Sequence, residues 1–128
     1  MRTIDNIRRF RLSDTFVEPY KDATVPWGPL GYVTFKRTYA RRLNEFEPEA
    51  SGSEEWWQTC RRVVEGMFNM QKQHVFSLGL EWNDAKAQKT AKDAYDRLFN
   101  LKWTPPGRGL WMMGTKFVEE RTAAGLFN

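Results

Sequence analysis

The residues best suited to binding an anion lie in the last quarter of the chain. Residues 105–109 read PPGRG, and Gly114 and Thr115 follow shortly after. Glycines let backbone amides approach an anion closely, and a guanidinium can bind phosphate through two parallel hydrogen bonds. The segment lacks the Gly-Lys-Ser/Thr ending of a P-loop. A phosphate-bearing ligand and a plain structural turn are both compatible with this pattern.

Two other residues of chemical interest are the single cysteine, Cys60, and the single histidine, His74. Cys60 falls on the apolar stripe of an expected helix, where a free cysteine usually packs as a small hydrophobic residue. His74 has no second histidine or acidic residue four positions away, which favours a surface role over metal binding or proton transfer. We therefore expect no catalytic residue, no metal site and no internal disulfide in this chain.

The sequence contains two adjacent acidic pairs, Glu54 with Glu55 and Glu119 with Glu120. Neighbouring residues on a helix point about 100° apart, so neither pair can act on one substrate atom. We interpret all four residues as helix-start charges or parts of solvated faces.

A basic run interleaved with aromatic residues comprises Lys36, Arg37, Arg41 and Arg42 beside Phe35 and Tyr39. Such a mixture is typical of proteins that bind single-stranded nucleic acid. Favourable electrostatics at a helix C-terminus explain the run more simply. A nucleic-acid partner is therefore the less favoured interpretation. A small basic nucleic-acid-binding module remains an alternative function, and a structural interaction domain without a ligand is a third.

Composition sets broad limits on the protein. The chain has 128 residues, and its 20 Lys plus Arg against 16 Asp plus Glu give a formal charge of +4, which permits nucleic acid but does not require it. No stretch approaches the roughly 18 apolar residues of a membrane span, and the start lacks the apolar core of a signal peptide. We expect a cytoplasmic protein without a membrane partner. The 6 Trp, 9 Phe and 4 Tyr are many for this length, so some of them are expected to face a partner.

The elements that must position these residues begin with a segment rich in turn signals. Residues 1–28 are punctuated by Pro19, Pro26 and Gly28, and Asp14 is a candidate cap for a short turn. We expect residues 1–28 to form an irregular arm rather than part of the core.

Residues 29–128 are expected to form a mostly helical second segment. A helix should begin at Pro29, because proline suits a first helical turn, although residues 32–35 could also form a strand. The paired prolines within residues 104–109 cannot continue a helix, so a structured loop is expected there. Thr115 is a candidate cap for a final short helix.

Two long helices dominate the middle of the chain. The first has Ser51 or Ser53 as its expected cap and ends at Gly79, which suits a left-handed stop. The second starts at Asn83 or Asp84 and carries small apolar residues on one stripe. The short connection predicts an antiparallel hairpin. The opposite face of the second helix should be solvated and comprises Lys86, Lys89, Lys92, Asp93 and Asp96.

Five separated blocks resemble the amino-terminal region of monomeric class II ribonucleotide reductases, which are adenosylcobalamin-dependent ribonucleoside triphosphate reductases. The blocks are residues 16–21 (FVEPYK), 27–31 (WGPLG), 36–41 (KRTYAR), 54–56 (EEW) and 106–111 (PGRGLW), the last followed by Gly114 and Thr115. They occur in the expected order, and the resemblance extends over nearly the whole chain from Phe16 onward. The sequence departs at Pro106, where the resemblance implies a small polar residue such as serine.

The resemblance implies a fold class and a set of site residues. The chain would be mainly α, the helical amino-terminal part of a ten-stranded α/β barrel whose first strand begins near residue 128. By carry-over, Gly107, Arg108, Thr115 and Asn128 shape the substrate-binding end of the active site. Thr115 would be the direct ligand to the phosphate or base of a ribonucleoside triphosphate.

The resemblance also implies a cofactor and a partner. In this family adenosylcobalamin generates a thiyl radical, and three cysteines with an asparagine and a glutamate do the chemistry; none of these is recognised here. The first cysteine of the reducing pair directly follows a segment like residues 126–128. We therefore expect a downstream reductase polypeptide that begins with that cysteine, joined as an intein or split-gene half. An arbitrary chain boundary is the alternative, and this chain alone is expected to be inactive.

Overall fold

The described residues of the computed structural model are 8–116, 118 and 119, and they form helices without a β-strand. One isolated antiparallel bridge joins Arg42 and Ser53. The elements in order are α1 (Asp14–Val17), the 3-10 turn η2 (Glu18–Lys21), α2 (Pro29–Thr38), the 3-10 turn η3 (Leu43–Glu45), α3 (Trp56–Ser77), α4 (Asp84–Phe99) and α5 (Gly107–Met112). The mainly helical expectation is confirmed, whereas Asn128 and the expected start of a barrel strand lie outside the described residues.

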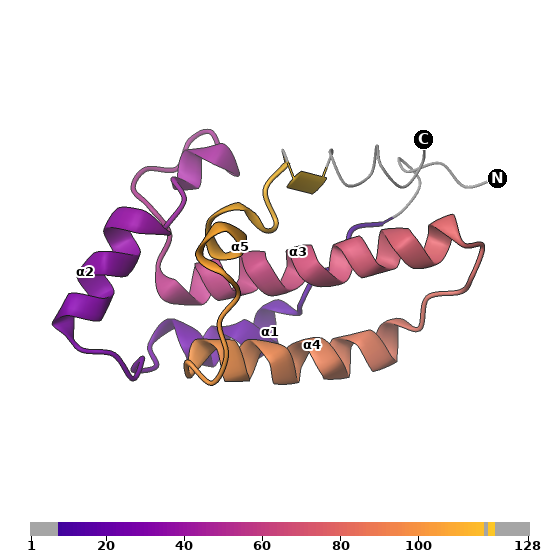
Figure 1. Ribbon diagram of the computed structural model, residues 1–128, viewed down its shortest axis with the longest axis horizontal. Coiled ribbons are helices and arrows are strands. Elements are labelled where there is room, and N and C mark those ends of the chain that lie inside the picture. The colour runs from indigo at the N-terminus through magenta and orange to yellow at the C-terminus, as the bar shows by residue number, and fades with distance from the viewer. Residues whose placement is uncertain (1–7, 117, 120–128) are drawn as a thin grey trace.

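An antiparallel hairpin of α3 and α4 forms the body of the protein (Figure 1). Cys60 and Val63 of α3 and Ala91 and Leu98 of α4 are fully buried. The small alanine on α4 lets the two helices approach closely. Gly79 follows the end of α3 with a φ of +74°, a conformation that disfavours any residue with a Cβ. The hairpin and its stop signal are confirmed.

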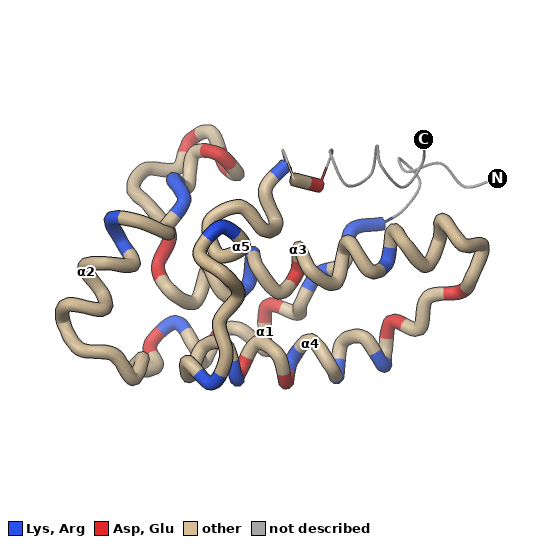
Figure 2. Tube along the Cα trace, viewed as in Figure 1, with Lys and Arg blue, Asp and Glu red and all other residues tan. Residues whose placement is uncertain are grey.

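The second helix of the hairpin starts as the sequence predicts. Asn83 is the N-cap of α4, and its side-chain oxygen accepts a hydrogen bond from the amide of Lys86 at 3.1 Å. Figure 2 shows charged positions along the side of α4 that faces away from α3. The five charged residues expected to be solvated are all exposed, which confirms the polarity of this helix: Lys86, Lys89, Lys92, Asp93 and Asp96.

The first helix of the hairpin starts later than the sequence pattern suggests. The N-cap of α3 is Glu55, not Ser51 or Ser53. The amide of Glu55 donates to Oε1 of Gln58 at 2.8 Å, which satisfies it in the manner of a capping box. Ser53 and Glu54 instead pair with the preceding segment: Ser53 forms the bridge with Arg42, and the amide of Glu54 donates to the carbonyl of Arg41 at 2.8 Å.

The amino-terminal segment belongs to the core, so the expectation of a separate arm is wrong for residues 8–17. Phe10, Leu12 and Val17 are at most 2% exposed. The amide of Leu12 donates to Oε2 of Glu65 at 2.8 Å, which replaces the hydrogen bond that this extended backbone would otherwise make with water. The cap of α1 is Ser13 rather than Asp14. Side chains on α3 therefore provide the pairing that the local sequence does not reveal.

Helix α2 is attached to one end of the hairpin by a cluster of large rings. The ring of Trp27 lies 5.5 Å from that of Phe35 and 4.9 Å from that of Trp56, between centroids. The indole of Trp56 in turn donates to the carbonyl of Phe99 at 3.0 Å. The helical interpretation from Pro29 is confirmed, and the strand alternative for residues 32–35 is wrong.

The glycine-rich segment that we expected to be a loop begins a short helix. Pro106 is the N-cap of α5, and its carbonyl accepts the first helical hydrogen bond from Leu110 at 3.0 Å. Leu110 is 8% exposed, so its burial fixes a turn that glycines alone would not favour. Among the described residues, no helix has the length and apolar character needed to cross a membrane.

The burial of Phe10 generates a prediction. Its ring stacks on Phe68 at 5.3 Å between centroids, so Phe10→Ala should leave a cavity in the core and lower the free energy of unfolding by about 3–5 kcal/mol. Urea-induced unfolding of the whole chain measures this loss. The control is Val33→Ala, at a side chain that is 46% exposed, which should change stability by less than about 0.5 kcal/mol. Equal losses in the two variants would contradict a core role for residues 8–17.

Candidate substrate-binding site

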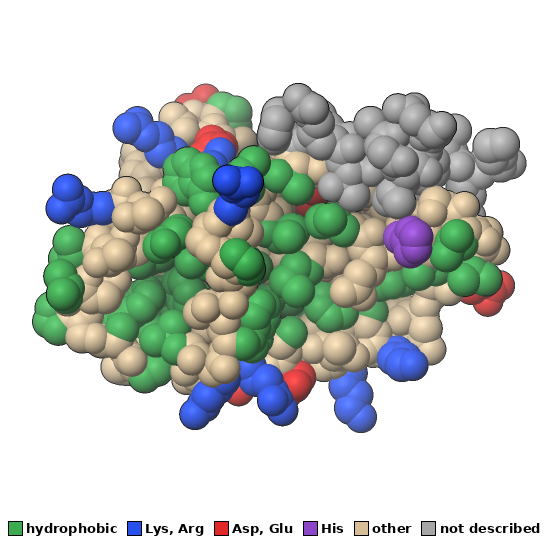
Figure 3. Space-filling view, viewed as in Figure 1, with side chains coloured by type: hydrophobic (Ala, Val, Ile, Leu, Met, Phe, Trp, Pro, Cys, Tyr) green, Lys and Arg blue, Asp and Glu red, His purple; other side chains and the backbone are tan. Residues whose placement is uncertain are grey.

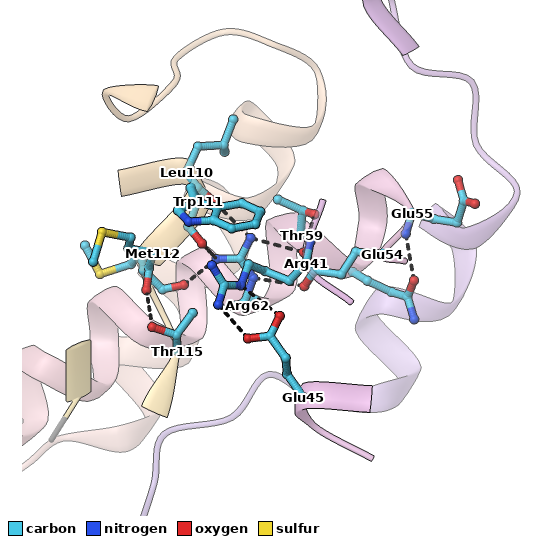
Figure 4. Close-up of polar contacts among 12 residues, drawn as sticks. Arg41, Glu45, Glu54, Glu55, Thr59, Arg62, Leu110, Trp111, Met112 and Thr115 are labelled. Carbon is cyan, nitrogen blue, oxygen red and sulfur yellow. Dashed lines mark hydrogen bonds and ion pairs between the residues drawn. The ribbon is translucent and has the colours of Figure 1, made fainter. Parts of the chain in front are cut away.

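A buried ion pair between Glu54 and Arg62 lies at the centre of the candidate site (Figure 4). The two side chains are 3% and 5% exposed. Nε of Arg62 donates to Oε2 of Glu54 at 2.9 Å, and Nη2 donates to Oε1 at 3.1 Å. The pairing is bidentate, which is the strongest geometry for a guanidinium and a carboxylate.

The remaining donors of Arg62 bind the end of α5. Nη2 donates to the carbonyl of Leu110 at 2.9 Å, and Nη1 donates to those of Trp111 at 3.3 Å and Met113 at 2.6 Å. An arginine has five N–H donors, and these contacts with the two to Glu54 use all of them. The last carbonyls of a helix need partners from outside it. Arg62 therefore joins the C-terminal end of α5 to the middle of α3.

Glu54 is equally well satisfied, and our interpretation of it as a solvated helix-start charge is wrong. Its Oε1 also accepts hydrogen bonds from the amide of Arg41 and the hydroxyl of Thr59, both at 2.9 Å. Glu55 is exposed, as expected for a residue at a helix start. The two adjacent glutamates thus point into different environments, and only Glu54 contributes to the site.

The backbone at Gly114 packs directly on α3. Gly114 has a φ of +80°. A Cβ placed on it would lie 2.2 Å from the carbonyl oxygen of Arg62, and a Cβ on Gly66 would lie 2.5 Å from the Cα of Gly114. Both distances are far below any van der Waals contact. This close approach explains why a glycine stands at position 66, in the middle of a long helix. The left-handed backbone of the turn explains the glycine at position 114.

Thr115 follows this turn and is 5% exposed. Its hydroxyl donates to the carbonyl of Met112 at 2.7 Å, and its own carbonyl accepts from the amide of Glu119 at 3.1 Å. Residue 116 begins the next helical stretch, so Thr115 does stand at a helix start. In this rotamer the hydroxyl proton is already used, and the oxygen remains available as an acceptor.

Thr115 lines a cleft of about 760 Å³ that runs along α3. Most of the charged groups in its wall are paired: Arg9 with Glu119, Arg41 with Glu45, and Arg61 with Glu65. Burial raises the pKa of the Glu119 carboxyl, although Arg9 acts in the opposite direction. The side-chain oxygen of Gln73, a further lining residue, is buried without a hydrogen-bond partner.

The structure does not bring the four expected site residues together. Gly107 and Arg108 are exposed at the first turn of α5 and are not among the residues that line the cleft. Thr115 is buried in the cleft wall at the other end of that helix. Asn128 lies outside the described residues. The phenol oxygen of Tyr39 would lie 3.2 Å from a Cβ at Gly107, so this glycine permits a close side-chain contact.

Cys60 and His74 occupy the places that the sequence predicts. Cys60 is fully buried, and burial raises the pKa of its thiol well above the ordinary value. A thiol in this state is a poor nucleophile. His74 is exposed near the end of α3. Across residues 8–116, 118 and 119, no three side chains of His, Cys, Asp or Glu form a group that could hold a metal ion.

Half of the basic run that suggested nucleic-acid binding is engaged within the protein. Nζ of Lys36 donates to the carbonyls of Ser53 and Glu54 and pairs with Glu55. The guanidinium of Arg41 lies 4.0 Å above the ring of Trp111 and pairs with Glu45. Arg37 and Arg42 are exposed. Helix-end and local electrostatics account for the engaged half of the run.

Comparison with known proteins identifies the family. The family described as the ribonucleotide reductase alpha domain matches residues 12–115. The chain belongs to the ribonucleotide reductase alpha-domain family. The adenosylcobalamin-dependent ribonucleoside-triphosphate reductase of Lactobacillus leichmannii is 41% identical over 91% of this chain, and that of Euglena gracilis is 38% identical over 94%. These matches span only 15% and 16% of the two relatives.

A solved structure supports the same relationship. The crystal structure of a B12-dependent (class II) ribonucleotide reductase superposes on 84% of this reductase-family chain with a TM-score of 0.68 and 40% sequence identity. The superposition covers 14% of that protein. The helical arrangement described above is therefore similar to one small part of a class II reductase.

The adjacent glutamates provide a matched test of the buried pair. Glu54→Ala should lower the free energy of unfolding by about 3–5 kcal/mol, because it leaves the Arg62 guanidinium buried without its counter-ion. Glu55→Ala removes an exposed carboxylate that caps α3 and pairs with Lys36, and should cost only about 1–2 kcal/mol. Chemical unfolding of both variants measures the difference. A loss for Glu54→Ala no larger than that for Glu55→Ala would show that the pair contributes little.

Proposed function

We propose that this chain is the amino-terminal part of an adenosylcobalamin-dependent ribonucleoside-triphosphate reductase, which makes deoxyribonucleotides for DNA synthesis by thiyl-radical chemistry. The observation that carries the proposal is the alignment of nearly the whole chain with reductases of that name. In this proposal the chain itself performs no chemical step, because its one thiol is fully buried. Its contribution is to build and hold part of the substrate-binding wall.

Adenosylcobalamin, which supplies the radical when bound, belongs in this proposal to the rest of the enzyme. The described residues offer it no ligand, because most charged side chains of the cleft wall are paired with one another. His74 is exposed near the hairpin end, and Cys60 is inside the core. We therefore assign no cofactor contact to this chain.

We assign the substrate contacts of this chain to Thr115, Arg108, Gly107 and Asn128 by analogy with the family. Two structural features support part of this assignment. The guanidinium of Arg108 is exposed and makes no ion pair with the described residues, so it is available for a phosphate. The Thr115 oxygen can accept a hydrogen bond from a substrate hydroxyl or amino group without breaking its contact to Met112.

The proposed partner is a downstream reductase polypeptide that carries the catalytic cysteines. The chain spans about 15% of the curated relatives it matches. Apolar side chains gather at the end of the molecule that carries α2 (Figure 3). Leu30 is 79% exposed and Val33 is 46% exposed. We propose association with that polypeptide either covalently, as an intein half, or non-covalently, as a split-gene product.

Co-expression with the downstream reading frame tests the proposed assembly. The expected result is a complex, or a single spliced chain, that reduces ribonucleoside triphosphates when adenosylcobalamin is supplied. Intact-mass measurement and a pull-down on this chain distinguish the covalent from the non-covalent form. Recovery of both polypeptides as separate monomers without reductase activity would refute the proposal.

Thr115→Val tests the proposed substrate contact. A suitable enzyme is a chimera in which this chain replaces the matching segment of the Lactobacillus leichmannii reductase, with which it is 41% identical. Loss of the hydroxyl oxygen should raise KM for the ribonucleotide roughly tenfold, which corresponds to one lost hydrogen bond. Thr90→Val is the control, because this exposed hydroxyl on α4 donates only to its own helix. Unchanged kinetics for Thr115→Val would remove Thr115 from the site.

A further inference from the structure

We propose that Arg62 is a positioning residue, which with Glu54 sets the backbone turn that places Thr115 in the cleft wall. The substrate part of this inference rests on the proposed function of Thr115. The structural part rests on the contacts of the guanidinium alone. Arg62 lines the cleft but offers a ligand no free donor, because every N–H is used internally. It can act on substrate binding only through the segment that it holds.

The contacts of Arg62 bracket the turn. Its guanidinium binds the carbonyls of Leu110 and Trp111 before the turn and the carbonyl of Met113 immediately next to Gly114. A lysine at this position would keep the charge, but its ammonium has three donors on one atom and cannot span these carbonyls and Glu54 together. The shape of the guanidinium, as well as its charge, therefore determines the position of residues 110–115.

A second contact fixes the same turn without any charge. The backbone of Gly114 lies against Gly66, one turn along α3 from Arg62, where a methyl group would overlap the Gly114 backbone. The hydrogen bonds of Arg62 hold the turn against α3, and the absence of a side chain at Gly66 leaves room for the Gly114 backbone. Two independent substitutions can therefore displace Thr115 without altering Thr115 itself.

Besides Gly66, other contacts hold the chain on either side of the turn: Met113 packs against the core, and Glu119 pairs with Arg9. Leu110 is buried, and the ring of Trp111 is stacked by Arg41. Both lie before the turn, so neither restrains Gly114. The hydroxyl of Thr115 bonds back to Met112 within the same segment and does not attach it to α3. We expect the turn, and not the whole of α5, to loosen first when Arg62 is changed.

Hydrogen–deuterium exchange on the whole chain tests the structural part. Arg62→Lys should speed exchange of peptides covering residues 110–115 by about tenfold or more, while peptides from the α3–α4 hairpin stay protected. Arg61→Lys is the matched control, because Arg61 is the preceding residue and donates instead to the carbonyl of Leu12 and to Asp14. It should loosen the segment around Leu12 only. Unchanged exchange over residues 110–115 in Arg62→Lys would overturn the proposal.

Kinetics of the chimeric reductase tests the substrate part. Arg62→Lys should raise KM for the ribonucleotide about as much as Thr115→Val does, with a smaller change in kcat, because ground-state binding is lost. If exchange increases but KM does not, while Thr115→Val does raise KM, Arg62 has no positioning role. If neither variant changes KM, the ligand role of Thr115 is wrong, and the substrate role of Arg62 is overturned with it.

Gly66→Ala keeps the test decisive if Arg62→Lys fails to fold. The added methyl should displace Gly114 while leaving the Glu54–Arg62 pair present. Faster exchange of residues 110–115 and a raised KM would support the inference that the position of the turn governs binding. A well-folded Gly66→Ala protein with a displaced turn and unchanged KM would overturn it, provided that Thr115→Val raises KM.

Discussion

The buried pair of Glu54 and Arg62 is the interaction on which the arrangement of this chain depends. Removing two opposite charges from water costs several kcal/mol, and their attraction compensates only when their other hydrogen-bonding groups are also satisfied. Here Glu54 accepts from the backbone near α2, and Arg62 donates to the backbone after α5. The requirement for full satisfaction thus forces two segments far apart in sequence to meet on α3. If either segment moved away, a hydrogen-bonding group of the buried pair would be left unsatisfied.

Helix α3 serves both sides of the structure because it has two buried faces. Its apolar face packs on α4. A second face carries three buried polar residues and a glycine at helical spacing, which bind incoming backbone or approach it closely: Arg62, Glu65, Asn69 and Gly66. Glu65 accepts from the amide of Leu12 and Asn69 from that of Phe10, while Arg62 and Gly66 hold the turn after α5. A polar stripe on a helix of this kind looks solvated in sequence, although it is a docking surface for extended chain.

The parts that the sequence predicted are those governed by local interactions. The hairpin follows from two apolar stripes, a left-handed Gly79 and the Asn83 cap, all of which act within a few residues. The role of Glu54 could not be read in this way, because it precedes the helix and its side chain bonds the distant amide of Arg41 as well as Thr59 and Arg62 within the helix. The burial of Phe10 and Leu12 was missed for the same reason. The family resemblance indicated Thr115 as a site residue. The contacts of Arg62 that hold the preceding turn are visible only in the structure.

The aromatic side chains and the charged groups of the cleft share one property: most of them are already held in place by contacts within the chain. Many of the rings that seemed excessive for this length pack on one another, as Trp27, Phe35 and Trp56 do. Most charges in the cleft wall are likewise paired within the chain. What such a chain can offer to a ligand is a backbone turn of fixed shape and the few polar atoms that its own contacts leave unused. Under the proposed function this order favours substrate binding, because binding loses less conformational entropy when the wall is already ordered.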